Sequence, residues 1–592
     1  MQKTFERVWE LLNKNWADVF IKKVKKIPSV YVKSFIIIFS VAMIAFAFHT
    51  INFLPGDHVI HKGRLVYPIG VNHTINIGRF SLFYIMNLLT GGHLLPVLNN
   101  IYSLLGFSIG AIMLCIYWKI PKTVLYYSII GTLLVIQPYT LLSFWYSFSA
   151  IGDLWLLLCV VSSFLLADNA FQTAKISQKI ICESLSVILI VFVLGAYPPI
   201  VNTIAVVFLG RLIIDVFLEK EISFSFFYKT ILKHKYSIIS LAIGAVIFKL
   251  ILEYLKIIGK LSVAAYSLQT ISIENFPSHF MEVVNIAFSQ LWNFPVAFFP
   301  IEWTRLFTII FIFAIAIIIL NILFDESYTQ ILNRPKMIKC AKILYIVFLA
   351  IAVIIFSKTA AIISGEEVAS VRWDAHILSF GTPLLHVLPI ALVCVQKIQL
   401  PKNLTIIVCI ALINMCLIQD VLALKVWKYG YDAESNLWQR VVIRIENDPS
   451  FNRDKGYEYI FIGRVPSYRP NYYYKSKDVM HLNNILDRAY ASVHSQATLT
   501  FFYPDLLAKS TFGSNFLSTL RRNDKKALEY AAKLKNEINN AQVWPSKNSV
   551  IVKDDAVIVV FNKTDLAKVK KIIQDYETLQ KQEAPAIKTN GK

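Results

Sequence analysis

A short polar segment after the first apolar run of the chain holds an acid that could act as a general base. The sequence there reads Asn52-Phe-Leu-Pro-Gly-Asp57, so Asp57 comes directly after a Pro-Gly turn. A carboxylate at the point where a chain leaves a membrane is partly desolvated, which makes it a stronger base. A solvated loop acid is the alternative interpretation, and position alone does not decide between the two.

Basic side chains in the same segment could hold a phosphate group. They are Lys62, Arg64 and Arg79, and the last stands in the string Gly78-Arg79-Phe80. The planar guanidinium of Arg donates two parallel hydrogen bonds to a phosphate, and the neighbouring glycine allows close approach of the backbone. Snorkelling of the same side chains to lipid headgroups is an equally good explanation by residue chemistry.

Histidines in this segment raise the question of a metal site. His58 and His61 have the i, i+3 spacing of one helix face and His73 follows, but Pro55-Gly56 disfavours a regular helix there. The seven cysteines form no CxxC pair that would indicate zinc or an iron–sulfur cluster. We therefore expect no metal.

A second polar segment runs from residue 364 to 374. Its charged residues are Glu366, Glu367, Arg372 and Asp374, and Trp373 stands among them. The segment is short, so its charges stay near the membrane surface, where Arg372 could meet a lipid phosphate. Trp373 could stack on a sugar, although an anchor at the membrane interface is the more ordinary role of such a residue.

The elements that must position these residues are membrane spans. The chain has 592 residues, of which 56% are hydrophobic and 16% charged, and its mean hydropathy is +0.55. Apolar runs of about 20 residues recur, which is typical of a polytopic membrane protein and excludes a cytosolic enzyme. The net charge of +21 comes from Lys and Arg beside these runs and from a basic C-terminal region, so we expect no nucleic-acid binding.

Eleven spans are expected from the apolar runs and the charge of the loops between them. They cover residues 34–54, 96–117, 123–141, 148–167, 181–197, 199–218, 236–254, 304–323, 342–363, 376–396 and 403–424. The loops expected inside all carry Lys or Arg: Lys119, Lys122, Lys175, Lys179, 220–235, 334–342, Lys397 and Lys402. By the positive-inside rule the N-terminus is cytoplasmic, and residues 425–592 lie outside, in the periplasm of a Gram-negative cell.

Two stretches are expected to lie in the plane of the headgroups, at 79–89 and around 281–294, although both could instead be broken spans. After residue 424 the chain changes character. Helical patterns at 434–446 and 524–540 alternate with strand-like runs at 457–462 and 550–561. These patterns predict a membrane domain over residues 1–424, with its catalytic outer loop at 55–93, and a small α/β domain over 425–592.

This arrangement resembles the membrane glycosyltransferases of the C superfamily (GT-C), and in particular the phage-type, serotype-converting glucosyltransferases that modify O-antigen. The resemblance rests on the acid after the first span, the Gly78-Arg79-Phe80 string at the start of a short juxtamembrane helix, some ten or eleven spans, and a C-terminal outer domain. Family members often have two adjacent acids in the first loop, whereas here Asp57 is followed by His58.

The resemblance implies a GT-C-like polytopic α-helical fold and an inverting transfer of glucose or a similar hexose. The donor would be a polyprenyl-phosphate sugar, and the acceptor a lipid-linked O-antigen or lipopolysaccharide glycan on the periplasmic side of the bacterial inner membrane. No cofactor or metal is implied, because the donor is a monophosphate.

The same resemblance implies roles for the loop residues. Asp57 would deprotonate the acceptor hydroxyl, and the lipid phosphate would be stabilised by Arg79, Arg64, Arg372 or Lys62. The residues assigned to acceptor binding are His58, Glu366, Glu367, Trp373 and Asp374.

Two other functions compete with this one. A polysaccharide polymerase would be expected to use large, Arg-rich outer loops rather than a terminal globular domain. A lipid-linked sugar flippase or transporter would need ionisable residues near the middle of its spans, whereas Asp153, Arg211, Asp215 and Lys249 all lie close to expected span ends.

Overall fold

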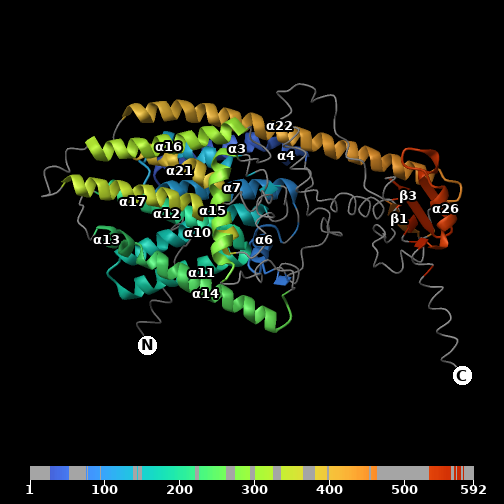
Figure 1. The fold of residues 1–592 in the computed structure, drawn as a ribbon, viewed down its shortest axis with the longest axis horizontal. Helices are drawn as coiled ribbons and strands as arrows, with labels where there is room; N and C mark the ends of the chain where they lie inside the picture. Colours follow the sequence, from blue (N-terminus) through green and yellow to red (C-terminus); the bar gives the residue numbers. More distant parts are fainter. Residues whose placement is uncertain are drawn as a thin grey trace, which may run out of the picture.

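The computed structural model describes residues 27–52, 75–137, 140, 143–144, 150–219, 226–261, 274–293, 301–324, 335–363, 381–396, 399–452, 455, 457–462, 532–561 and parts of 566–578, apart from residues 77, 92 and 94. Everything below about the structure concerns these residues. They form a bundle of helices lying side by side, and a small sheet stands beyond one end of the bundle (Figure 1).

Eight helices in the described part of the chain are long and apolar enough to cross a membrane. They lie in α7 Pro96–Tyr117, α10 Ala150–Gln172, α11 Ile176–Ala196, α12 Val201–Leu218, α14 Lys235–Ile257, α16 Ile301–Phe324, α17 Pro335–Phe356 and α22 Gln399–Glu446. Each is apolar around most of its circumference, as expected of a helix surrounded by lipid and other helices. The chain is therefore a polytopic helical membrane protein.

Three shorter apolar helices coincide with the remaining expected spans. They are α3 Ser29–Ala45, α8 Val124–Val135 and α21 Thr382–Cys394. α3 has 17 residues, α8 has 12 and α21 has 13. α8 and α21 are clearly shorter than the roughly 20 residues that a full crossing takes. The total of eleven spans stays a prediction.

The helices differ in how much of their surface is covered. Of the eight, α12 is the most enclosed and α14 the most exposed. On α14, Ile243, Val246 and Leu250 are exposed, as expected of a helix that faces lipid. The closely packed pair α7 and α10 is held by Gly106, where a Cβ atom would come within 2.4 Å of the Trp155 ring, and by a hydrogen bond of 2.7 Å from Trp155 Nε1 to the carbonyl oxygen of Tyr102.

Both stretches expected in the headgroup plane contain helices. The first is α6 Leu82–Thr90, whose 9 residues are too few for a crossing. The second is α15 Phe276–Asn293, which runs across the direction of its neighbours in Figure 1. Placement of α6 and α15 in the headgroup region stays a prediction.

The longest helix joins the bundle to the sheet. α22 has 48 residues, so it is about 72 Å long, more than twice the thickness of a hydrocarbon core. The span expected over 403–424 and the helix expected over 434–446 are thus parts of one continuous helix, and the domain boundary expected after residue 424 falls inside it.

The sheet has three strands, in the order β1-β3-β2. β1 Glu458–Ile462 pairs in parallel with β3 Ala556–Val560, and β2 Val550–Lys553 pairs antiparallel to β3. The β2–β3 hairpin turns at Asp554, which has a φ of 54°. The strand-like runs read from the sequence correspond to these three strands, and α26 Lys535–Asn540 lies within the expected helical stretch 524–540.

The last turns of α22 belong to the core of this sheet unit. Val441 and Ile445 are buried with Trp544 and with strand residues such as Val559. Arg444 donates hydrogen bonds from Nη1 to the carbonyl oxygens of Pro545 and Ser546, at 2.9 and 2.8 Å. The helix therefore holds the sheet unit firmly at its own end.

Candidate functional site

Of the residues expected to do chemistry, Arg79 alone lies in the described part of the chain. The expected base and the other expected ligands fall outside the described residues: Asp57, His58, Lys62, Arg64, Glu366, Glu367, Arg372, Trp373 and Asp374. Whether these side chains gather around Arg79 is therefore still a prediction.

The Gly78-Arg79-Phe80 string forms a tight connection to α6. Gly78 has a φ of 78°, a conformation that side chains other than glycine rarely adopt, and its N–H donates to the carbonyl oxygen of Ile75 at 2.9 Å. Two residues beyond Arg79, the N–H of Ser81 donates to the carbonyl oxygen of Gly195 at 3.0 Å. The hydroxyl of Ser81 donates to the carbonyl oxygen of Phe192. The segment is thus fixed to the last turn of α11.

Phe80 completes this attachment by packing against a helix that lacks a side chain at the point of contact. A Cβ atom at Gly195 would lie 2.4 Å from the Phe80 ring, so only glycine fits there. On its other side Phe80 approaches Phe248 of α14, with ring centroids 6.1 Å apart. The backbone of Arg79 is therefore held on both sides.

The side chain of Arg79 lies over an aromatic ring and is half-buried. Its guanidinium carbon is 4.3 Å from the centroid of the Tyr197 ring, a cation–π contact. Arg79 forms no hydrogen bond or ion pair with any side chain or backbone group that the structure describes. Among the described residues its donors are thus unoccupied, as a site for an anion requires. Tyr197 is itself fixed, because it is buried and directly precedes the 3-10 helix η1 Pro198–Ile200.

An exposed apolar surface lies next to this cation. α6 buries Leu82, Ile85 and Met86 against the bundle, while Tyr84 is 63% and Leu88 84% exposed. A guanidinium beside an uncovered apolar helix face suits a ligand that has an anionic head and a hydrocarbon tail.

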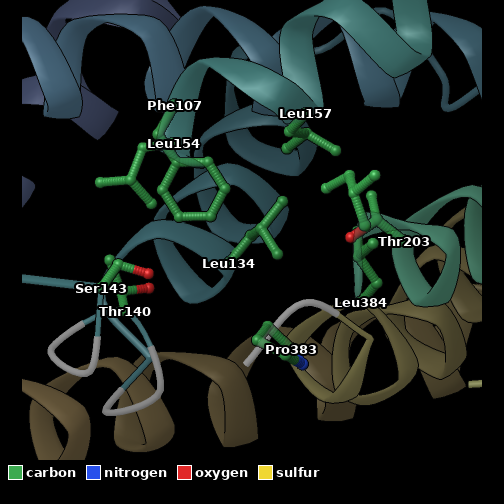
Figure 2. A pocket seen from close by; sticks show the side chains of 10 residues that line it. Phe107, Leu134, Thr140, Ser143, Leu154, Leu157, Thr203, Pro383 and Leu384 are labelled. Carbon is green, nitrogen blue, oxygen red and sulfur yellow. The ribbon is translucent and has the colours of Figure 1, made fainter. Parts of the chain in front are cut away.

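Behind η1 the bundle has a partly open pocket of about 40 Å³. Figure 2 shows the hydroxyls of Thr140 and Ser143 together on one side of it and Thr203 on the opposite side, with Leu134 and Phe107 between them. The pocket is lined by Phe107, Leu134, Thr140, Ser143, Leu154, Leu157, Ile200, Thr203, Pro383 and Leu384. This space suits a water molecule or two and is too small for a hexose. Nothing in the sequence distinguished these Ser and Thr residues from others in apolar runs.

A buried lysine lies at the break between α17 and α18 Thr359–Ile363. Lys358 is 4% exposed, and its ammonium donates to the Thr382 hydroxyl at 3.2 Å. The break is also held by Asn202, whose side-chain oxygen accepts from the N–H of Ala360 at 2.8 Å. Lys358 lies within an expected span, where a lysine is itself a sequence signal of a functional position.

At the opposite end of the bundle, here called the basic end, an ionic cluster ties several helices together. Asp215 of α12 has a side chain that is 2% exposed, and it is surrounded by cations. Arg211 Nε lies 3.0 Å and Lys119 Nζ 2.7 Å from its two carboxylate oxygens. His234 Nε2 is 3.0 Å from the same carboxylate.

Further pairs extend this cluster to α10. Arg211 Nη2 lies 3.6 Å and His234 Nδ1 3.7 Å from the carboxylate of Asp168. Burial alone would lower the pKa of His234, but pairing with Asp168 and Asp215 outweighs it and raises that pKa above 6.5. The cluster is a network of ion pairs that joins α10, α12 and the start of α14, although the buried His234 Nδ1, at ion-pair distance from Asp168, has no hydrogen bond among the described residues.

Comparison of the chain with protein-family models, with curated proteins and with solved structures gives no match. A function therefore has to be inferred from the residues and their geometry.

Proposed function

We propose that this protein is an inverting hexosyltransferase that works at the outer surface of a bacterial inner membrane. It transfers glucose or a similar hexose from a polyprenyl-phosphate carrier to a lipid-linked O-antigen or lipopolysaccharide glycan. One observation carries the proposal: the guanidinium of Arg79 lies over Tyr197 with no acceptor among the described residues, beside an exposed apolar face of α6. A lipid-linked phosphate has the matching head and tail.

The charge at one end of the bundle supports the proposed orientation. Lys119, Lys233 and Lys342 all lie at the basic end, which the positive-inside rule assigns to the cytoplasm. The end that holds Arg79 and the sheet unit is then periplasmic. Alkaline phosphatase fused after Phe561 should be active, and a cytoplasmic reporter fused at the same place should be silent. The reverse pattern would overturn the orientation.

In the proposed reaction, Asp57 takes the proton of an acceptor hydroxyl. The oxygen then attacks the anomeric carbon, and the bond from that carbon to the phosphate oxygen breaks with inversion. Arg79 stabilises the charge that develops on the departing phosphate, assisted by Arg64, Arg372 or Lys62. The products are the glycosylated acceptor, the polyprenyl phosphate and a proton on Asp57.

The test is sugar transfer by the purified full-length protein in liposomes that contain polyprenyl-phosphate glucose. Arg79→Lys keeps the charge but loses the planar fork, so kcat/KM for the donor should fall roughly ten- to hundredfold. Arg440→Lys is the matched control, because Arg440 also lies over an aromatic ring, Trp544, but in the sheet unit. Wild-type use of the donor by Arg79→Lys would remove Arg79 from the reaction.

Transport of a lipid-linked sugar is the second candidate. It is favoured by Lys358 and Asp420, both buried within the helical bundle, since ionisable groups inside a bundle mark many transport pathways. Movement of a fluorescent polyprenyl-phosphate sugar across a liposome bilayer, without transfer to any acceptor, would favour this alternative.

A further inference from the structure

One buried carboxyl group in the bundle, that of Asp420, has no hydrogen-bond partner among the described residues. Asp420 lies on the side of α22 that faces the other helices, and it is 0% exposed. The buried residues of that side recur at helical spacing: Thr405, Cys409, Leu412, Cys416, Asp420 and Leu424. The Asp420 side chain therefore lies on the buried side of α22, in line with side chains that are apolar or only weakly polar.

Neither carboxylate oxygen of Asp420 has a hydrogen-bond partner among the described residues. A buried polar group without a partner is costly, and an isolated charge is more costly still, so the site needs a proton or a bound hydrogen-bond donor. This contrasts with Asp215, which has three close partners. Asp420 contributes no contact in this structure that would explain it as a stabilising residue.

The position of Asp420 along α22 places it at the Arg79 end of the bundle. Near the start of α22, the ammonium of Lys402 lies 5.9 Å from the centroid of the Tyr126 ring, at the basic end. Asp420 follows 18 residues later, a rise of about 27 Å, close to the thickness of the hydrocarbon core. There α22 contacts α4 Ala47–Asn52, the helix from which the first loop departs (Figure 1).

Buried polar side chains gather at this end of α4, where His49 and Thr50 are both buried. The side-chain amide of Asn100 donates to the hydroxyl of Thr50 at 3.4 Å, and both residues are buried. Gln419, next to Asp420 in the chain, is 9% exposed and adds another amide. Carboxylates and amides are the side chains that accept from and donate to neighbouring hydroxyls of a sugar.

We propose that Asp420 is a sugar-binding residue, whose carboxyl accepts hydrogen bonds from the hydroxyls of a hexose that enters at the Arg79 end. This inference rests on the proposed function, because the hexose is that of the lipid-linked donor or of the acceptor glycan. It adds a buried contact on α22 to the phosphate contact proposed for Arg79.

The proposal predicts opposite effects of replacing Asp420 on the stability of the empty protein and on its affinity for the sugar. Replacing an unpartnered buried carboxyl by an apolar side chain of similar size should make the empty protein more stable, while removing its hydrogen bonds to the sugar should weaken binding. A residue with a purely structural role would not show this opposite movement of the two quantities.

The experiment uses the full-length protein in lipid nanodiscs, and compares the wild type with Asp420→Leu and Asp420→Asn. Thr405→Val is the matched control, because Thr405 lies on the same stripe at the basic end. Thermal unfolding without ligand gives the stability. Affinity is measured for a short-chain prenyl-phosphate glucose, for the same prenyl phosphate without sugar, and for an isolated O-antigen oligosaccharide.

Asp420→Leu should melt above the wild type and bind one sugar probe about tenfold or more weakly. Loss confined to prenyl-phosphate glucose identifies the donor hexose, and loss confined to the oligosaccharide identifies the acceptor. Binding of prenyl phosphate without sugar should be unchanged, as should all binding by Thr405→Val. If Asp420→Leu fails to fold, Asp420→Asn should show the same loss of sugar affinity.

Wild-type affinity of the Asp420 variants for both sugar probes would overturn the proposal. So would a cation site, recognised when replacing sodium by choline shifts the melting of the wild type but not of Asp420→Asn. These measurements need no turnover, so they stay informative if transfer itself is not found, and retained transfer by Asp420→Leu would reject the residue while leaving the transferase standing.

Discussion

The two ends of the helical bundle treat their charges in opposite ways. At the basic end, Asp215 is surrounded by Arg211, Lys119 and His234, and Lys342 donates to the carbonyl oxygens of Phe217 and Glu219 at the end of α12. At the other end, Arg79 lies over a ring and Asp420 has no hydrogen-bond partner among the described residues. Among the described residues, the central acid of the basic end has several cations around it, whereas the buried acid at the other end has none.

This difference separates the charges that stabilise the fold from those that we assign to ligand binding. A network of paired charges at low dielectric strengthens itself and fixes the positions of the helices that it joins. A buried group without a partner weakens the fold, and proteins keep such groups mainly at functional sites. The basic end therefore anchors α10, α12 and α14, while the Arg79 end is where we place the chemistry.

The largest effect is expected at the residue assigned as base. Asp57→Asn should lower transfer by roughly 10²–10⁴-fold and leave thermal unfolding unchanged, because Asp57 would act on the acceptor and not on the fold. The assay is transfer from polyprenyl-phosphate glucose to acceptor glycan, with and without EDTA. Near-normal turnover of the variant would exclude Asp57. Loss of wild-type activity in EDTA would instead bring His58, His61 and His73 forward as metal ligands.

The next effect should appear at the basic end, in stability and not in activity. Asp215→Ala leaves Arg211 and Lys119 without their central acid, which should cost about 3–5 kcal/mol for a broken buried pair. Thermal unfolding in detergent or nanodiscs measures it. Lys249→Ala is the control, because its ion pair with Glu253 is about half exposed and should be worth little. Equal melting of the two variants would contradict the assignment of the cluster.

A smaller effect, on both stability and donor use, is expected at Gly195, which packs against the residue next to Arg79. Gly195→Ala places a Cβ atom against the Phe80 ring, so Phe80 must move and Arg79 with it. Overpacking of this kind costs about 1–3 kcal/mol, and donor use should fall more than stability predicts. Gly259→Ala is the control for the change to alanine in open space, since no atom lies within 4 Å of its Cβ position, although its φ of 67° adds local strain. Unchanged donor affinity in Gly195→Ala would show that the attachment at α11 does not position Arg79.

The smallest effect is a pH dependence of stability from His234. Its pKa is raised above 6.5 in the folded protein by Asp168 and Asp215. The protonated form is therefore favoured by folding, and its contribution is complete below pH 6.5 and is lost as the pH rises through the folded pKa. The melting difference between wild type and His234→Gln should shrink by roughly a few degrees across that range. A difference that grows with pH would give the wrong sign and reject the pairing.

Much of the helical architecture was predictable from the chain. Apolar runs marked the positions of α7, α10, α11, α12, α14 and α16 because a span needs about 20 residues that lipid will tolerate. Alternating apolar residues likewise marked the three strands. The ends of the helices were harder to predict. Nothing in residues 425–433 indicated that α22 continues without a break, because local helix propensity does not include the packing of its last turns against the sheet.

The site was predictable only in part. Arg79 was singled out by its neighbours Gly78 and Phe80, but its ring partner Tyr197 is more than 100 residues away in the sequence. The sequence places Asp215 and Arg211 near a span end, but it does not reveal their partners Lys119 and His234, because pairing depends on which helix ends meet. Nothing in the sequence distinguishes Asp420, since a single acid near the end of an apolar run is ordinary.

The amino-acid sequence by itself determined that this protein spans the membrane several times, where most of its helices lie, and which end carries the excess of Lys and Arg. These properties depend on local hydrophobicity and charge, which each segment carries with it. Only the tertiary structure decided that Asp215 has partners and Asp420 has none, and that Arg79 lies over Tyr197. Whether a charge is satisfied depends on groups brought together from distant parts of the chain, and the burial that makes the answer matter is created by the same packing.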